Sequence, residues 1–212
     1  GHNYICHNYI GDNYAIPSTS NGQGFDEFFG IRNGFIDNFN HYFLHGKGYH
    51  DLYEGTTEVF QPDQYFPKLI TDRALSFIKE NKTKPFLLYL GFNIPHYPEQ
   101  ALPEHAALYK DLPMPRRSYA AITTTTDYYI GLVLRQLDTL HLTDNTIVIF
   151  QSDNGHSSEN KTAIDIDDHA SGYPKGHYYS ANGGGGNTGK WIGAKGSFLE
   201  GGIRVPAVVS WP

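Results

Sequence analysis

Short apolar runs separated by longer amphipathic segments constrain the fold of this chain more than any other feature. Residues 86–90, 146–150 and 207–210 are brief and almost wholly apolar, a pattern typical of strands that are covered on both faces. Residues 66–78 and 119–140 carry apolar side chains at helical spacing instead. Because such helices cover the faces of a sheet, the alternation predicts an α/β fold in which helices flank a central sheet.

Two long stretches show neither the short apolar runs of strands nor the apolar spacing of helices. Residues 1–60 are rich in Gly, Asn, Tyr, Phe and His, and residues 157–196 are polar and include four consecutive glycines at 183–186. Loops of this length are uncommon in compact domains unless they serve a site. We therefore expect these two stretches to contribute to a functional site rather than to the hydrophobic core.

Composition excludes several classes of protein. The 212 residues include 16 basic and 22 acidic side chains, for a net charge of −6, and no Lys/Arg cluster that could displace counterions from a nucleic acid. The longest apolar runs fall far short of the roughly 20 residues that cross a bilayer. We therefore expect neither nucleic-acid binding nor a membrane span. At roughly 150 residues per domain, the chain is one large domain or part of one.

A possible cation site follows the run at 146–150. Asp153 and Asn154 lie between Ser152 and Gly155, just past the carboxyl end of this predicted strand, where open α/β sheets bind their ligands. Carboxylate and amide oxygens suit hard cations such as Ca²⁺. The alternative is a turn in which Asp153 and Asn154 bond their own backbone.

A histidine and a lysine mark two further loops. His96 lies between Pro95 and Pro98, which stiffen the loop, and its imidazole could bind an anion or protonate a leaving oxygen. The alternative is a histidine packed among aromatic side chains. Lys195 lies in a short loop between Gly193 and Gly196, and its ammonium group could bind sulfate or phosphate. The alternative is an ordinary solvated lysine.

Taken together and in order, these motifs resemble the catalytic domain of type I sulfatases in the alkaline phosphatase superfamily. The resemblance rests on a Gly-Phe-Asp element, a Pro-His-x-Pro segment, the Ser-Asp-Asn-Gly sequence and a Glu-Gly-Gly-Ile-Arg-Val-Pro signature, at residues 24–30, 95–98, 152–155 and 200–206. It implies an alkaline phosphatase-like α/β fold whose central sheet is mostly parallel and, in this chain, incomplete.

The resemblance also implies roles for particular residues. Asp153 and Asn154 would ligate Ca²⁺, while His96 and Lys195 would contact the sulfate and assist departure of the alcohol. His156 and His177 would bind substrate in the loops that select it. The implied activity is hydrolysis of sulfate esters, with sulfated glycans as substrates and a periplasmic or extracellular location.

The nucleophile of this family is a formylglycine, made from Cys or Ser in a Cys/Ser-x-Pro/Ala-x-Arg motif. Cys6 lies in Cys-His-Asn-Tyr-Ile, which does not fit that motif. We therefore expect residues 1–212 to be a partial sulfatase catalytic domain, without the nucleophile segment and the C-terminal subdomain. The chain by itself would then be inactive, whereas its intact parent would be a sulfatase.

Two other functions remain open at this point. The chain could belong to a phosphoester or phosphonate hydrolase of the same superfamily, because sulfate and phosphate esters share tetrahedral geometry. It could also be a non-catalytic binder of sulfated glycans that keeps Lys195 and His96. The segment that carries the nucleophile would discriminate among these functions.

Overall fold

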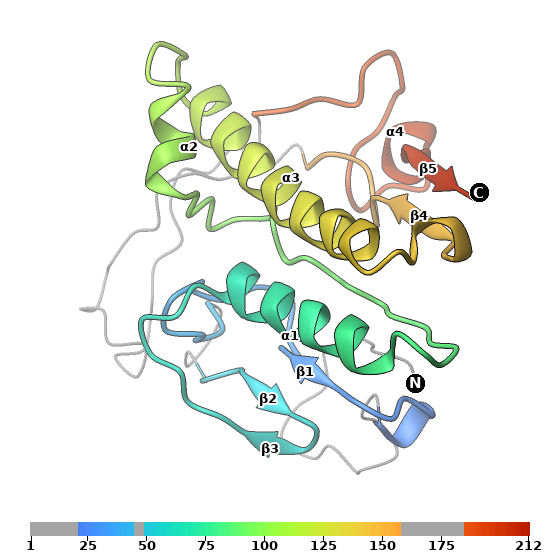
Figure 1. The fold of residues 1–212 in the computed structure, drawn as a ribbon. Helices are drawn as coiled ribbons and strands as arrows, with labels where there is room; N and C mark the ends of the chain where they lie inside the picture. The colour runs from blue at the N-terminus through green and yellow to red at the C-terminus, as the bar shows by residue number, and fades with distance from the viewer. Residues whose placement is uncertain (1–20, 45–48, 158–184) are drawn as a thin grey trace. The chain divides into compact units, whose positions relative to one another are not determined.

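A computed structural model describes residues 21–44, 49–157 and 185–212 of the chain. These residues fall into two compact units (Figure 1). The first unit contains the described residues up to Ile94, and the second contains those from Pro95 onward.

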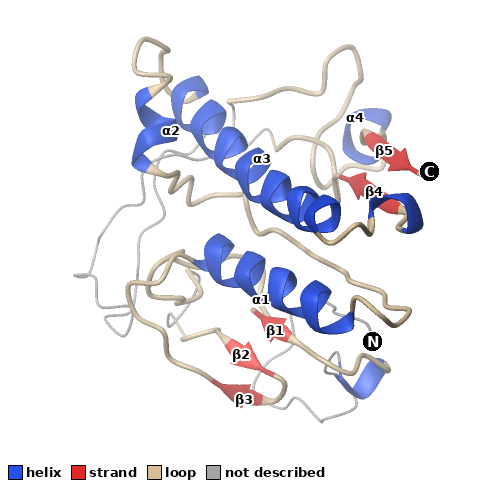
Figure 2. Ribbon diagram, in the orientation of Figure 1, coloured by secondary structure: helices blue, strands red, loops and turns tan. Residues whose placement is uncertain are grey.

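The first unit combines a small sheet with one long helix. After a short 3-10 helix at Asn21–Gln23, strands β1 (Phe29–Gly30), β2 (Tyr53–Glu54) and β3 (Thr57–Glu58) form an antiparallel sheet in the order β1-β2-β3. Helix α1 (Phe66–Asn81) follows, and it contacts β1 (Figure 2). The helix predicted from the apolar spacing at residues 66–78 is thus confirmed.

Helix α1 supplies much of the core of this unit. Its buried face includes Phe66, Ile70 and Phe77, and Pro67 in the first turn suits the helix start because no backbone N–H is needed there. Phe66 and Ile70 pack against a cluster that includes Ile36 and Leu52. The periodicity of the sequence therefore specified both the helix and the face it buries.

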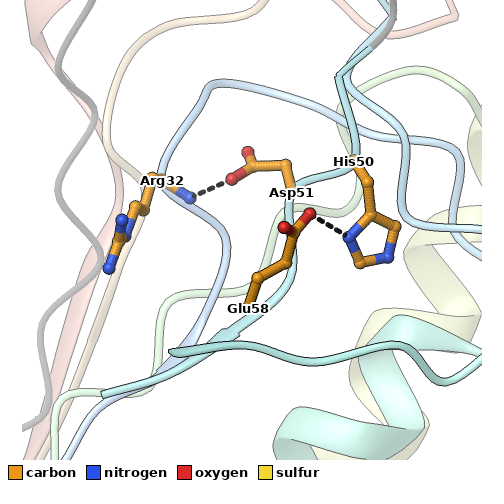
Figure 3. Close-up of polar contacts among 4 residues, drawn as sticks. All are labelled: Arg32, His50, Asp51 and Glu58. Atoms are coloured by element: carbon orange, nitrogen blue, oxygen red, sulfur yellow. Dashed lines mark hydrogen bonds and ion pairs between the residues drawn. The ribbon is translucent and has the colours of Figure 1, made fainter. Parts of the chain in front are cut away.

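The buried carboxylate of Asp51, just before β2, accepts two backbone hydrogen bonds. Asp51 is 1% exposed, and its two oxygens accept the backbone N–H groups of Arg32 and Asn33 at 3.0 and 2.8 Å. Burial raises the pKa of Asp51, and these two hydrogen bonds partly oppose that shift. Beside it, His50 Nδ1 and Glu58 Oε1 are 2.9 Å apart (Figure 3). The Asp51 hydrogen bonds join segments 18 and 19 residues apart, and the His50–Glu58 contact joins residues eight apart, so we assign both contacts a structural role.

His41 is a buried imidazole with an unusual environment. Its backbone is left-handed, with φ of 64°, and its Nε2 lies 2.8 Å from the carbonyl oxygen of Gln64. Because a carbonyl only accepts, Nε2 carries the proton, and the buried Nδ1 has no partner among the described residues. Burial lowers the pKa of His41; the Gln64 carbonyl and Asp37 oppose this shift, and His50 adds to it.

This burial predicts a pH-dependent stability. The unfolded chain takes up a proton on His41 near pH 6.5, whereas the folded chain does so only at lower pH. The free energy of unfolding should therefore fall as the pH is lowered below about 6.5, with no contribution from His41 above that value. Urea unfolding between pH 7.5 and 5.5 should show this slope, and His41→Asn should flatten it.

His141 provides the matched control, because it also has a left-handed backbone, with φ of 55°, but is exposed. His141→Asn should keep the wild-type slope. Equal slopes in wild type and His41→Asn would contradict the assignment.

The second unit contains the longest helix. Helix α2 (Pro103–Ala107) packs against α3 (Arg116–Thr139), and a 3-10 helix at Thr143–Asn145 leads into strand β4 (Val148–Gln151). A one-turn helix α4 (Glu200–Ile203) and strand β5 (Ala207–Ser210) close the unit. The helix predicted at residues 119–140 and the positions of the strands predicted near 148 and 207 are confirmed, but the predicted burial of these strands is wrong, since most of their residues are exposed. Of the described helices, none combines the length and apolar character needed to cross a bilayer.

The strand pairing differs from the prediction. Strands β4 and β5 pair antiparallel, with Val148 opposite Ser210 and Gln151 opposite Ala207. Residues 86–90 belong to none of the described strands, and Leu87 is 52% exposed. The mostly parallel sheet is thus not found among the described residues, where every ladder is antiparallel. An apolar run reports a preference for burial, but the direction of its neighbour depends on distant chain connections.

Candidate functional site

Two of the three loops singled out in the sequence are joined by backbone hydrogen bonds in the second unit. The loop after β4 donates from Ser152 N to Pro206 O at 3.4 Å and from Gly155 N to Gly202 O at 2.9 Å. In the opposite direction, Lys195 N donates to His156 O at 3.1 Å. The loop that carries Asp153 and Asn154 is therefore held against the loop that carries Lys195.

Glycines make this approach possible. A Cβ atom on Gly155 would lie 1.8 Å from Gly201 O, and one on Gly201 would lie 2.2 Å from Gly193 O. A Cβ on Gly202 would lie 2.1 Å from Ser197 O. Because the obstructing atoms belong to the backbone, no side-chain rotation could relieve these clashes. The sequence showed the glycines but not their mutual contact, which requires the folded arrangement.

His96 brings the third loop to the same place. Lys195 Nζ lies 2.8 Å from His96 Nε2, and His96 Nδ1 lies 2.9 Å from the carbonyl oxygen of Tyr97. Since the Tyr97 carbonyl accepts, Nδ1 carries the ring proton, and Nε2 is the acceptor for the ammonium group of Lys195. The structure thus joins His96 and Lys195, which are 99 residues apart in sequence.

The predicted cation ligands, Asp153 and Asn154, lie at the end of β4. Asp153 Oδ1 accepts the backbone N–H of Asn154 at 2.8 Å, and Asn154 Nδ2 donates to Gly155 O at 2.9 Å. These bonds match the turn considered as the alternative. They also leave Asp153 Oδ2 and Asn154 Oδ1 without a hydrogen bond among the described residues.

The chemistry of these two oxygens fits Ca²⁺, which prefers carboxylate and amide oxygen ligands. Their number does not complete a shell, because Ca²⁺ takes about six to eight oxygens. Within residues 21–44, 49–157 and 185–212, no group of three or more His, Cys, Asp or Glu side chains could hold a metal. Asp153 and Asn154 could therefore supply two oxygen ligands to a cation, which would need further ligands from other residues or from water.

His156, the residue after Gly155, contacts two other segments of the second unit. Its ring Nε2 accepts the backbone N–H of Gly186 at 3.2 Å, and its ring meets Tyr119 edge-on with centroids 5.1 Å apart. Burial lowers the pKa of His156, and the nearby Arg116 guanidinium adds to this shift. Arg116 also donates to Gly185 O at 2.8 Å. The second predicted substrate histidine, His177, lies outside the described residues.

The geometry predicts that Gly155 tolerates no side chain. Gly155→Ala should lower the free energy of unfolding by about 1–3 kcal/mol, the usual cost of overpacking, because the two loops must separate. Urea unfolding would measure this loss. Gly131→Ala is the matched control, since Gly131 lies within α3 and its nearest obstruction, 3.1 Å away, is the mobile end of Arg135. A Gly155→Ala protein as stable as Gly131→Ala would contradict the packing described here.

Comparison with known proteins places these loops in a family. A family model described as "Sulfatase" matches residues 3–212. The chain is 35% identical over 160 residues to N-acetylgalactosamine-6-O-sulfatase of Bacteroides thetaiotaomicron, an alignment that covers 74% of this chain and 28% of that protein. It is 30% identical over 196 residues to arylsulfatase J of Mus musculus, which covers 90% of this chain and 29% of that protein.

Solved structures agree with this similarity. The crystal structure of Ps i-CgsB in complex with k-i-k-neocarrahexaose matches with a TM-score of 0.70 and 27% identity, over 100% of this chain and 44% of that one. The PsFucS1 sulfatase from Pseudoalteromonas sp. matches with a TM-score of 0.67 and 20% identity, over 99% of this chain and 42% of that one, and shows the fold alone. The chain spans less than a third of the length of the two curated relatives described above. It belongs to the sulfatase family, and its fold is the alkaline phosphatase-like α/β fold predicted from the motifs.

Proposed function

We propose that the protein carrying this sequence hydrolyses sulfate esters of carbohydrates. The observation that carries the proposal is the contact of 2.8 Å between Lys195 Nζ and His96 Nε2, in a loop held by hydrogen bonds against the Asp153–Asn154 turn. A relative named N-acetylgalactosamine-6-O-sulfatase and a structural neighbour solved with a neocarrahexaose support a sugar substrate. These names favour sulfate over phosphate esters.

Lys195 is suited to hold the sulfuryl group. Its ammonium has three N–H donors, of which His96 Nε2 accepts one. The exposed position of Lys195 leaves the other two donors accessible to the oxygens of an entering sulfate. Such charge-assisted hydrogen bonds strengthen where negative charge develops, so Lys195 would stabilise the transition state.

His96 is suited to move a proton to the leaving alcohol. Its Nδ1 is held by the Tyr97 carbonyl, which fixes the ring and leaves Nε2 as the atom that exchanges protons with Lys195. When the bond between sulfur and the bridging oxygen breaks, that oxygen must gain a proton to leave as an alcohol. The Lys195–His96 pair can hold and deliver this proton.

Asp153 and Asn154 would hold part of a calcium site, and the formylglycine implied by the family resemblance would supply the nucleophile. When bound, Ca²⁺ would offset the negative charge of the sulfuryl oxygens. The Asp153–Asn154 turn is fixed by its own two hydrogen bonds before any ligand enters. Such preorganisation lowers the entropic cost of binding.

Lys195 provides the direct test of the proposed activity. In the intact protein that carries this sequence, Lys195→Ala should lower kcat/KM for 4-nitrophenyl sulfate by about 10²–10³-fold, the usual cost of losing one donor to a developing oxyanion. Lys110→Ala is the matched control, because Lys110 is an exposed lysine of the same unit, and it should leave the rate within about twofold of wild type. Wild-type turnover by Lys195→Ala, or hydrolysis of 4-nitrophenyl phosphate in preference to the sulfate, would overturn the proposal.

Calcium binding can be tested without turnover. Ca²⁺ should raise the melting temperature of the chelator-treated protein, since a ligand that binds only the folded state stabilises it. Asp153→Asn should reduce this rise, whereas Asp111→Asn, which alters an exposed carboxylate of the same unit, should preserve it. An equal rise in wild type and Asp153→Asn would remove Asp153 from the calcium site.

A further inference from the structure

A second group of cations lies on the loop that carries Lys195. Lys190 Nζ is 4.8 Å from the centroid of the Trp191 ring, and the guanidinium carbon of Arg204 is 4.4 Å from the same centroid. Trp191 is half-buried, while Lys190 and Arg204 are exposed. We call Lys190, Trp191 and Arg204 the indole cluster.

The indole cluster carries net positive charge. Arg204 forms an ion pair with Glu200 one helical turn earlier, which compensates its charge. Lys190 has no carboxylate partner among the described residues. The cluster with Glu200 therefore keeps one positive charge in a chain whose net charge is −6.

The backbone fixes the indole cluster near the candidate site. Thr188 Oγ1 donates to the carbonyl oxygens of Trp191 and Gly193, at 2.9 and 3.2 Å, and Gly201 N donates to Ile192 O at 2.8 Å. Trp191 precedes Lys195 by four residues, so their Cα atoms are at most about 14 Å apart. A sulfated oligosaccharide of a few units could therefore contact both.

We propose that the indole cluster is a second anion site, which binds another sulfate group of a polysulfated glycan. This inference rests on the proposed function and adds to it a substrate class: sugars with more than one sulfate. Lys190 would supply the positive charge, and Arg204 would donate hydrogen bonds to the anion from its planar guanidinium group. The Trp191 ring would hold both cations and offer an apolar surface to the sugar.

The test compares binding of a polysulfated sugar with binding of a single sulfate. Isothermal titration with sucrose octasulfate and with sodium sulfate would give two dissociation constants for each variant. Lys190→Gln should weaken octasulfate binding about tenfold, the effect of losing one charge-assisted contact, and should weaken sulfate binding far less. Lys190→Arg should restore the octasulfate affinity because it keeps the charge.

Lys110→Gln is the matched control, since it removes the same charge from an exposed lysine of the same unit. It should leave the octasulfate affinity near that of wild type. The proposal is overturned if Lys190→Gln binds octasulfate as wild type does, or if Lys110→Gln weakens it equally, because the effect would then reflect net charge. It is also overturned if wild type does not bind octasulfate.

Hydrolysis of 4-nitrophenyl sulfate separates this inference from the proposed function. If the intact protein does not hydrolyse the ester but its octasulfate binding still depends on Lys190, the anion site stands and the proposed activity fails. If the ester is hydrolysed and Lys190→Gln binds octasulfate normally, the activity stands and the second anion site fails.

Discussion

Close packing of backbone against backbone, between residues 152–156 and 193–206, is the constraint on which the candidate site depends. Gly155 and Gly201 approach so closely that a single Cβ would collide with a carbonyl oxygen. Hydrogen bonds from Gly155 to Gly202 and from Lys195 to His156 close the same contact. Because backbone atoms cannot change rotamer, this contact holds the Asp153–Asn154 turn and the Lys195 loop in one arrangement, and the chemistry of the site follows from it.

The electrostatics of the site follow from that arrangement. An ammonium on Lys195 would be an ordinary solvated charge if its loop were unsupported, but here it meets the acceptor nitrogen of His96. The Tyr97 carbonyl decides which nitrogen that is, because it binds the opposite side of the ring. The oxygens of Asp153 and Asn154, on the adjoining loop, suit a cation. The site therefore combines one ammonium group with carboxylate and amide oxygens that suit a cation, in a chain that is acidic overall.

The sequence predicted local structure well where one element decided the outcome. The spacing of Phe66, Ile70 and Phe77 indicated both helix α1 and its buried face, and the motif around Asp153 was correctly placed at the end of β4. The sequence did not determine strand pairing: β4 and β5 run antiparallel, and residues 86–90 join no described ladder. Apolar periodicity records which side of an element is buried, whereas strand direction depends on segments far away in the chain.

The candidate site residues His96, Asp153, Asn154 and Lys195 could be proposed from the sequence because their types and order carry chemical meaning without coordinates. The contacts that these residues make could not be identified from the sequence. The tertiary structure decided that Lys195 meets His96 across 99 residues of chain, and that the His156 ring binds the Gly186 backbone. Residue type determines which charges and donors a chain possesses, but only the folded backbone determines which of them lie within hydrogen-bonding distance, because that distance depends on packing among segments that the sequence separates.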